Sequence, residues 1–270
     1  MRTESALATP GHGIGLGGLL VLGVLSLVFK TDLLSPFLGS RASAPATARS
    51  APNPGRKQAE VKLAEFVSFT IDDIQKFWTK GLPEQANVNY RKSHLVLFWD
   101  STRSACGAAE SATGPFYCPG DEKVYIDLGF YDELKRKFGA PGEFAQAYVI
   151  AHEVGHHLQN LLGTERKVSQ SLRTRPGLAN ALSVRMELQA DCYAGVWGYS
   201  AAQRGILETG DVKAGLNAAA AIGDDRLQKM ATGHVSPEKF THGSSAQRVE
   251  WFNRGLSEGK LSACDTFAAR

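Results

Sequence analysis

The strongest constraint on the fold of this chain is a pair of histidines four residues apart. The segment reads His152-Glu153-Val154-Gly155-His156 and stands among apolar residues. Residues four apart lie on one face of an α-helix, so both imidazoles can reach a single metal ion, with Glu153 projecting beside it. The small Gly155 suits a helix that packs closely against a neighbour. The sequence therefore predicts a helix with a metal-binding face.

A zinc ion that catalyses a reaction needs a third protein ligand and keeps one position open for water. The spacing that would add a third histidine is absent, because positions 159 and 162 are Gln and Leu. His157 points about 100° away around the helix. The best candidate is Glu187, on a second predicted helix. Asp191, one turn further on, can accept a hydrogen bond from the free ring nitrogen of a ligating histidine and fix its tautomer. The predicted site needs these two helices to face each other closely.

Two other interpretations of this pattern remain open. Paired histidines on a helix can be a coincidence of a surface or a core, and a metal site can be structural or inactive. A structural site has no use for Glu153, so its presence favours catalysis, with Glu153 accepting a proton from water. We therefore expect Zn²⁺ to be bound by His152, His156 and Glu187.

Hydrophobic spacing divides the body of the chain into helices and two strands. Strands are expected at residues 94–100 and 123–131, the second with clear alternation. The basic segment 164–180 is expected to be less ordered, and Thr70 with Asp73 could form a helix cap. Helices are expected at residues 61–82, 141–162, 182–203, 212–230 and 247–255.

The N-terminal region differs from the rest of the chain. Residues 13–29 carry no charge, and 17 residues lie at the short end of a membrane-spanning helix. A cleaved signal peptide is a rival interpretation, although Arg2 is offset by Glu4 and the small-residue site at 42–44 lies far from the apolar run. A buried core helix is the third, although five glycines would weaken it. An uncleaved anchor is favoured.

This interpretation gives a layout of four parts. We expect an N-terminal tail at 1–12, a transmembrane anchor at 13–30, an Ala/Pro/Ser-rich tether at 31–58 and the catalytic domain at 59–270. The remaining length suits one well-buried domain or two small ones. The expected location is the bacterial inner membrane, crossed once, with the domain on the periplasmic side. A net charge of +3, from 30 basic and 27 acidic side chains, does not indicate a nucleic-acid partner.

Four cysteines bear on the compartment of the domain. No C-x-x-C pair occurs, so a cysteine zinc site is not expected. An even number of cysteines behind an export-like segment suggests two disulfides outside the cytoplasm. The pairing Cys106–Cys118 with Cys192–Cys264 is favoured among the three that four cysteines allow. Four buried thiols in a cytoplasmic enzyme are the alternative.

Five segments resemble the signature segments of the bacterial family called putative neutral zinc metallopeptidases. They are FAQAYVIAHEVGHHLQNLLG, RMELQADCYAGVW, AAIGDDRLQ, FTHGSSAQRVEWF and ACGAAESATGPFYCPGDEKVYIDLGF. The resemblance covers residues from about 60 to 267. It implies an α+β, zincin-like domain, mostly helical with a small sheet. It also implies peptide-bond hydrolysis with the thermolysin-like ligands His152, His156 and Glu187, and Glu153 as base. The glycine-rich anchor and short tether depart from the family.

Other residues carry weaker predictions. His242, in a glycine-flanked loop, is our candidate to stabilise the oxyanion, with His234 and Tyr148 as rivals. A histidine hydrogen-bonded within its own loop is the alternative. Strand 123–131 could be an edge strand that pairs with an extended peptide, or simply a core strand. The doublet Asp224–Asp225 is expected to be a solvated face or a helix cap.

The resulting functional prediction is a membrane-anchored zinc metallopeptidase that acts on a protein or peptide. Two alternatives remain: a catalytically inactive zinc-binding membrane protein that binds protein partners, and a zinc amidase that acts on cell-wall crosslinks. The natural substrate and the oligomeric state do not follow from the sequence.

Overall fold

The structure is a computed structural model that describes residues 54–110, 114–136 and 142–268. The predicted tail and anchor, and most of the predicted tether, lie outside these ranges. None of the helices in the described ranges is long and apolar enough to cross a membrane.

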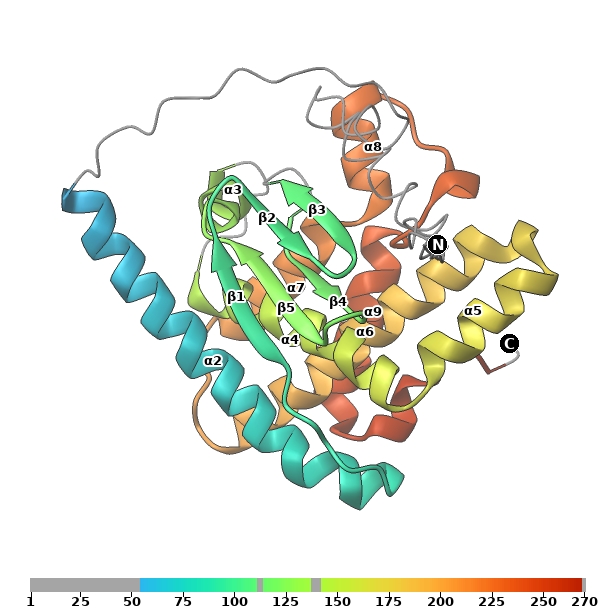
Figure 1. Ribbon diagram of the computed structural model, residues 1–270, viewed down its shortest axis with the longest axis horizontal. Helices are drawn as coiled ribbons and strands as arrows, with labels where there is room; N and C mark the ends of the chain where they lie inside the picture. Colours follow the sequence, from blue (N-terminus) through green and yellow to red (C-terminus); the bar gives the residue numbers. More distant parts are fainter. Residues whose placement is uncertain (1–53, 111–113, 137–141, 269–270) are drawn as a thin grey trace, which may run out of the picture.

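Helix α2 (Pro54–Ala86) runs along one side of the domain (Figure 1). Its fully buried apolar residues recur every three or four positions, which places them on one stripe facing the core. They are Val67, Ile71, Ile74, Trp78 and Leu82. The helix begins before residue 61, and Thr70 lies in its interior, where its hydroxyl donates to the Phe66 carbonyl at 2.8 Å. The expected cap at Thr70 is therefore wrong.

A small mixed sheet lies against the helices, as the α+β class requires. Strand β1 (His94–Phe98) pairs in parallel with β5 (Lys123–Asp127), and β4 (Phe116–Cys118) pairs with β5 in the antiparallel direction. Strands β2 (Ser101–Ser104) and β3 (Gly107–Glu110) form a separate hairpin.

Strand β5 is the central strand of the three, in the order β1-β5-β4. The expectation that segment 123–131 forms an edge strand is therefore wrong, and β4 takes the edge position. Alternation along β5 is real, because Val124 and Ile126 join the main core while Tyr125 packs with Phe98 on the opposite face. Alternation shows that the two faces of a strand have different surroundings. It does not show how many strands pair with it, so it could not distinguish an edge strand from a central one. Residues 130–131 belong to the short helix α3 (Phe130–Arg136).

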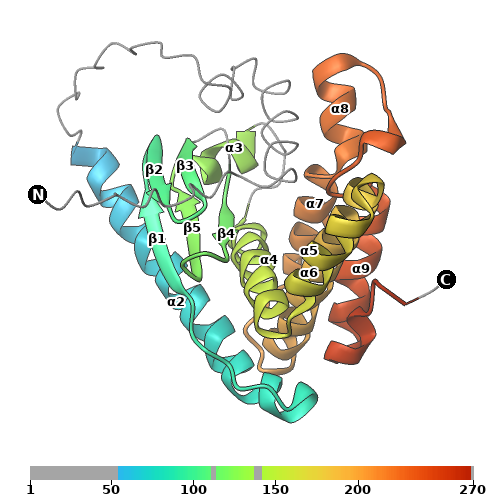
Figure 2. The ribbon, with the colours of Figure 1, turned by 45° about the vertical axis from the view of Figure 1, so that its right-hand side comes forward.

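The remaining helices form most of the domain. They are α4 (Glu143–Leu161), α5 (Thr164–Thr174), α6 (Ala179–Gln203), α7 (Asp211–Ala221), α8 (Asp224–Thr232) and α9 (Ser245–Glu258). Figure 2 shows α2 and the strands on one side, α6 and α9 on the other, and α4 between them. Helix α4 therefore touches both halves of the domain, which places its histidines in the interior.

Two helical predictions need correction. The basic segment expected to be less ordered forms α5 and a 3-10 turn at Pro176–Leu178, although no residue of α5 is buried. The apolar residues Val168 and Leu172 lie one turn apart on α5, so the helical spacing was present in the sequence but hidden among charged and polar residues. The helix expected at 212–230 is two helices, α7 and α8. The chain turns at Gly223, where an added Cβ would lie 2.3 Å from the backbone nitrogen of Ser245.

Both favoured disulfides are present in the structure. Cys106–Cys118 joins the β2–β3 hairpin to β4, and Cys192–Cys264 joins α6 to the 3-10 turn η4 (Leu261–Cys264) near the C-terminus. All four cysteines lie in the described ranges and none is free. The alternative of four buried thiols is therefore not what the structure contains.

Candidate metal centre

Helices α4 and α6 approach closely at Gly155, between the two histidines of the motif. A Cβ added at Gly155 would lie 2.9 Å from the carbonyl oxygen of Ala190 and 3.0 Å from its Cα. Real Cβ atoms do not sit that close to a neighbouring backbone, so only glycine permits this separation of the two helices. The close approach brings Glu187 on α6 to the histidines of α4, as the sequence predicts.

The three candidate ligands converge as a zinc site requires, because one ligand atom from each lies within 4.8 Å of the others. The Nε2 atom of His152 lies 3.2 Å from Glu187 Oε2 and 3.2 Å from His156 Nε2. His156 Nε2 approaches the other oxygen of the same carboxylate, Glu187 Oε1, at 3.6 Å. Ligands at 2.0–2.1 Å from a tetrahedral zinc ion lie roughly 3.4 Å from one another. The three side chains therefore fit one zinc ion, with both histidines using Nε2.

The other ring nitrogen of His152 contacts Asp191, the contact expected of that residue. Its Nδ1 lies 2.8 Å from Asp191 Oδ1. The guanidinium of Arg248, on α9, donates to both oxygens of Asp191 at 2.8 and 2.9 Å. The hydroxyl of Tyr148 also donates to Asp191, so this rival for the oxyanion belongs to the support of His152. All four side chains are buried, and together they fix the orientation of the His152 ring.

Gln159 supports the second histidine in the same way. Its Oε1 lies 2.9 Å from His156 Nδ1. The Gln159 amide nitrogen donates to the Met186 carbonyl at 2.7 Å and to Gln189 Oε1 at 3.2 Å. Because the amide nitrogen is held on α6, the oxygen faces the histidine and selects the tautomer that leaves Nε2 free for a metal. The sequence offered Gln159 only as the residue that breaks the third-histidine pattern.

Replacing Gln159 by leucine is expected to weaken zinc binding by about 10–100-fold. The change removes the acceptor that fixes the tautomer of His156 and leaves all three ligands in place. Competition with a chromophoric chelator measures the affinity. Asn160→Leu is the matched control, because Asn160 is the next residue of α4 and donates to the Tyr117 hydroxyl at 3.0 Å instead of to a ligand. Equal affinities of the two variants would show that Gln159 does not support the site.

The charges around the three ligand atoms favour a cation. Burial lowers the pKa of His152, but the charge of Asp191 and hydrogen bonds to Asp191 and Glu187 raise it to about 10. Burial raises the pKa of Glu187, but the neighbouring His156 and His152 bring it far below its usual range. Two ionised carboxylates therefore face the imidazoles from α6. A bound divalent cation would satisfy the same demand for positive charge.

Glu153 stands beside this cluster without a fixed partner. Its side chain is buried, and it makes no hydrogen bond with any residue in the described ranges. Burial raises the pKa of Glu153, although the charges of His156 and His152 oppose the rise. A carboxylate that is buried beside a metal site and left free by the protein can act on a water molecule or a substrate.

His242 is held near the ligands by the loop between α8 and α9. Asp224, the first residue of α8, accepts the backbone N–H groups of Thr241 at 2.6 Å, His242 at 2.6 Å and Gly243 at 3.0 Å. Its other oxygen lies 3.1 Å from His242 Nδ1. Burial lowers the pKa of His242, but the hydrogen bond to Asp224 and the charge of Glu187 raise it. His242 therefore lies within electrostatic reach of a metal ligand.

The structure bears on two predictions for this loop, the acidic doublet and the choice between His242 and His234. Asp224 is 1% exposed and organises the loop, so the prediction of a solvated acidic doublet is wrong for Asp224. The rival His234 is exposed, and its backbone hydrogen-bonds to Thr232. His242 is anchored by Asp224 of α8. Its Nδ1 atom also lies 3.1 Å from the Thr241 hydroxyl, so a hydrogen bond within its own loop is present as well.

His157 lies away from the ligand face, as the helical geometry predicts. Its side chain is fully buried, with Nε2 2.6 Å from the Arg91 carbonyl and Nδ1 3.0 Å from the Tyr117 hydroxyl. Both ring nitrogens are thereby satisfied by the segment before β1 and by β4. His157 joins α4 to the sheet and is not available to a metal ion.

Comparisons with known proteins place the chain in a family. The model of the family described as putative neutral zinc metallopeptidase matches residues 3–267. The match includes the N-terminal region, so the expectation that this region departs from the family is wrong. The uncharacterized protein YpfJ of Escherichia coli strain K12 is 49% identical over 268 residues, which cover 97% of this chain and 91% of that protein. The uncharacterized protein Rv2575 of Mycobacterium tuberculosis strain H37Rv is 43% identical over 211 residues, 74% of this chain and 69% of that protein. No solved structure is significantly similar.

Proposed function

The chain belongs to the putative neutral zinc metallopeptidase family, and on that premise we propose that it hydrolyses peptide bonds at a zinc ion, with Glu153 as general base. The observation that carries the proposal is the convergence of His152, His156 and Glu187, which bring one ligand atom each to within 4.8 Å of one another, with the two Nε2 atoms 3.2 Å apart. An open fourth position beside a free, buried carboxylate is the arrangement that catalytic zinc sites share.

Each side chain then has a definite task. His152, His156 and Glu187 would hold the zinc ion, which would supply the Lewis acidity that brings the pKa of bound water to about 7 and polarises a carbonyl group. Glu153 takes the proton of the attacking water and passes it to the leaving amine. His242 donates a hydrogen bond to the carbonyl oxygen as negative charge develops there.

The supporting residues keep these groups in place. Asp224 accepts from His242 Nδ1, so the opposite ring nitrogen, Nε2, is the one that can face a substrate. Arg248 and Asp191 fix the ring of His152 in the same manner. The edge strand β4 packs on α4, and its outer edge is the natural place for an extended substrate backbone to pair.

Membrane anchoring and a periplasmic domain belong to the same proposal. The uncharged run at 13–29 supports an anchor, and a domain with two disulfides suits an oxidising compartment. Fractionation of cells that carry the full chain, followed by protease treatment of spheroplasts, is the measurement. A domain that resists protease until the inner membrane is opened would contradict the periplasmic assignment.

Removal of the metal tests the peptidase proposal. We expect the purified protein to contain about one zinc ion per chain, to cleave unfolded casein, to lose cleavage with a chelator and to regain it with added zinc. Zinc content is measured by atomic emission and cleavage by release of labelled fragments. Zinc without any hydrolysis would favour the inactive binding protein. Hydrolysis confined to crosslinked cell-wall fragments would favour the amidase.

A further inference from the structure

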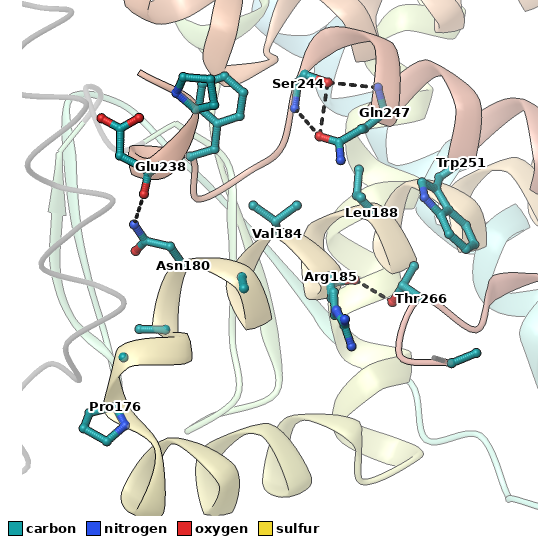
Figure 3. Close-up of a pocket in the computed structure, with 16 residues that line it drawn as sticks. Pro176, Asn180, Val184, Arg185, Leu188, Glu238, Ser244, Gln247, Trp251 and Thr266 are labelled. Atoms are coloured by element: carbon teal, nitrogen blue, oxygen red, sulfur yellow. Dashed lines mark hydrogen bonds between the residues drawn. The ribbon is translucent and has the colours of Figure 1, made fainter. Parts of the chain in front are cut away.

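A groove with a volume of about 800 Å³ lies on the surface beside the candidate metal centre. One wall is the N-terminal half of α6, and the other is the segment from residue 237 to α9. Figure 3 shows Val184 and Leu188 of α6 facing the segment that carries Glu238 and Ser244. The apolar lining includes the half-buried Val184 and Phe240, and the buried Leu188 and Trp251 beneath them, each 5% exposed. None of the three proposed zinc ligands lines the groove, so it is a separate feature of the surface.

The groove and the metal centre nevertheless share both walls. Glu187 lies between the groove residues Val184 and Leu188 on α6. His242 lies between Phe240 and Ser244, which line the opposite wall. At Gly243 an added Cβ would meet Leu188 at 3.2 Å and Val184 at 3.3 Å, so the loop rests directly on the helix. The groove and the candidate metal centre are therefore built on the same helix and the same loop, so a chain bound in the groove is attached to elements that also carry Glu187 and His242.

The length of the groove fits a short stretch of extended chain. Its lining residues on α6 run from Ala179 to Leu188, which corresponds to about 14 Å along the helix axis. An extended polypeptide advances about 3.3 Å per residue, so roughly four residues span this length. The volume also lies within the range of sites that bind ligands.

The chemistry of the lining fits a neutral chain with an apolar side chain. The charged residues that line it are Arg185 and Glu238, one of each sign. A nucleic acid or an anionic lipid surface would require a cluster of cations, which this lining does not provide. Asn180 donates to the Glu238 carbonyl at 3.0 Å, which joins the two walls at this point and fixes their separation.

We infer that this groove binds about four residues of the polypeptide substrate, with a large apolar side chain placed on the half-buried Val184 and Phe240, to one side of the cleaved bond. The inference rests on the proposed function and deepens it, because it makes unfolded polypeptides with apolar residues the substrate class. Burial of one leucine- or phenylalanine-sized side chain strengthens binding by about 10–100-fold. Peptides too short to reach the groove lose that contribution.

The test measures binding in the zinc-loaded full chain that carries Glu153→Gln, so that the probe is not cleaved. Ala181 is exposed and lines the groove, and both Glu and Lys are good helix formers, so Ala181→Glu and Ala181→Lys should preserve α6. Fluorescence anisotropy with labelled unfolded casein gives the Kd. We expect each variant to raise the Kd by at least about 10-fold, because either charge disfavours an apolar occupant.

Ala202→Glu is the matched control, since Ala202 is also exposed on α6 but does not line the groove. Its Kd is expected to equal that of the parent, and thermal unfolding of all variants checks their folding. Weaker binding with glutamate but tighter binding with lysine would show attraction to the acidic probe and overturn the inference. The inference would also be overturned if both variants bound casein as tightly as the parent, or if the parent did not bind casein. A parent dimer that Ala181→Glu converts to a monomer would overturn it too, because the groove would then be an interface between two copies of the chain.

The binding test with the residue 181 variants and the hydrolysis test with a chelator can fail separately. Binding that depends on residue 181 without any hydrolysis would sustain the groove and refute the peptidase proposal. Hydrolysis with a Kd that is insensitive to residue 181 would do the reverse.

Discussion

Replacing Glu153 by glutamine is expected to lower hydrolysis of unfolded casein by about 10²–10⁴-fold while zinc stays bound. Glutamine has nearly the same shape but cannot accept the proton of the attacking water. Glu153 is not among the three clustered ligand groups, so the metal content should not change. The protein makes no hydrogen bond to Glu153 within the described ranges, so the amide breaks no contact there. Initial rates and zinc content, measured on the same preparation, check both halves of the result.

Glu187→Gln separates the base from the ligand. An oxygen of Glu187 lies 3.2 Å from the Nε2 atom of His152, and the other lies 3.6 Å from that of His156. A neutral amide is a poorer zinc ligand than a carboxylate, so this variant should lose zinc and activity together. A Glu153→Gln variant as active as the wild type would refute the assignment of the base. Full zinc in Glu187→Gln would refute the assignment of the third ligand.

The ligand set could be predicted because it is local. The separation of His152 and His156, and that of Glu187 and Asp191, is one helical turn, so each pair is placed on a face by backbone geometry alone. The meeting of the two helices was a further assumption, supported in the sequence only by Gly155. The structure has that meeting, with Ala190 against Gly155.

The residues that hold the ligands could not be found in this way. Arg248 acts across a helix interface, and Asp224 acts on a loop 17 to 19 residues away. Gln159 contacts His156 within α4, but its amide is oriented by a contact with Met186 across the interface with α6. A single polar residue within an amphipathic helix leaves no periodic signal. Its partner depends on which helices pack together, and the sequence pattern does not determine that. A charged residue next to apolar ones, as Arg248 is beside Val249 and Trp251, was the available clue.

The packing of α6 on α9 determines where several of these residues stand. Helix α6 carries Glu187 and Asp191, and α9 carries Arg248, which donates to Asp191. The two helices are in contact through glycines. A Cβ at Gly255 would lie 2.0 Å from the Cys192 carbonyl oxygen, and one at Gly195 would lie 2.1 Å from that of Phe252. These neighbours are backbone atoms that cannot rotate away.

Gly255→Ala should therefore destabilise the domain strongly, by more than about 3 kcal/mol. Alanine in a helix interior is usually about 1 kcal/mol more favourable than glycine, so a loss isolates the contact with α6. Separation of the helices also pulls Arg248 from Asp191, so zinc affinity should fall as well. Urea unfolding of the zinc-loaded and zinc-free protein measures both effects. Gly177→Ala is the control, because a Cβ there meets nothing within 4 Å, and its stability should change by less than about 0.5 kcal/mol. Equal stability of the two variants would mean that α6 and α9 do not pack through Gly255.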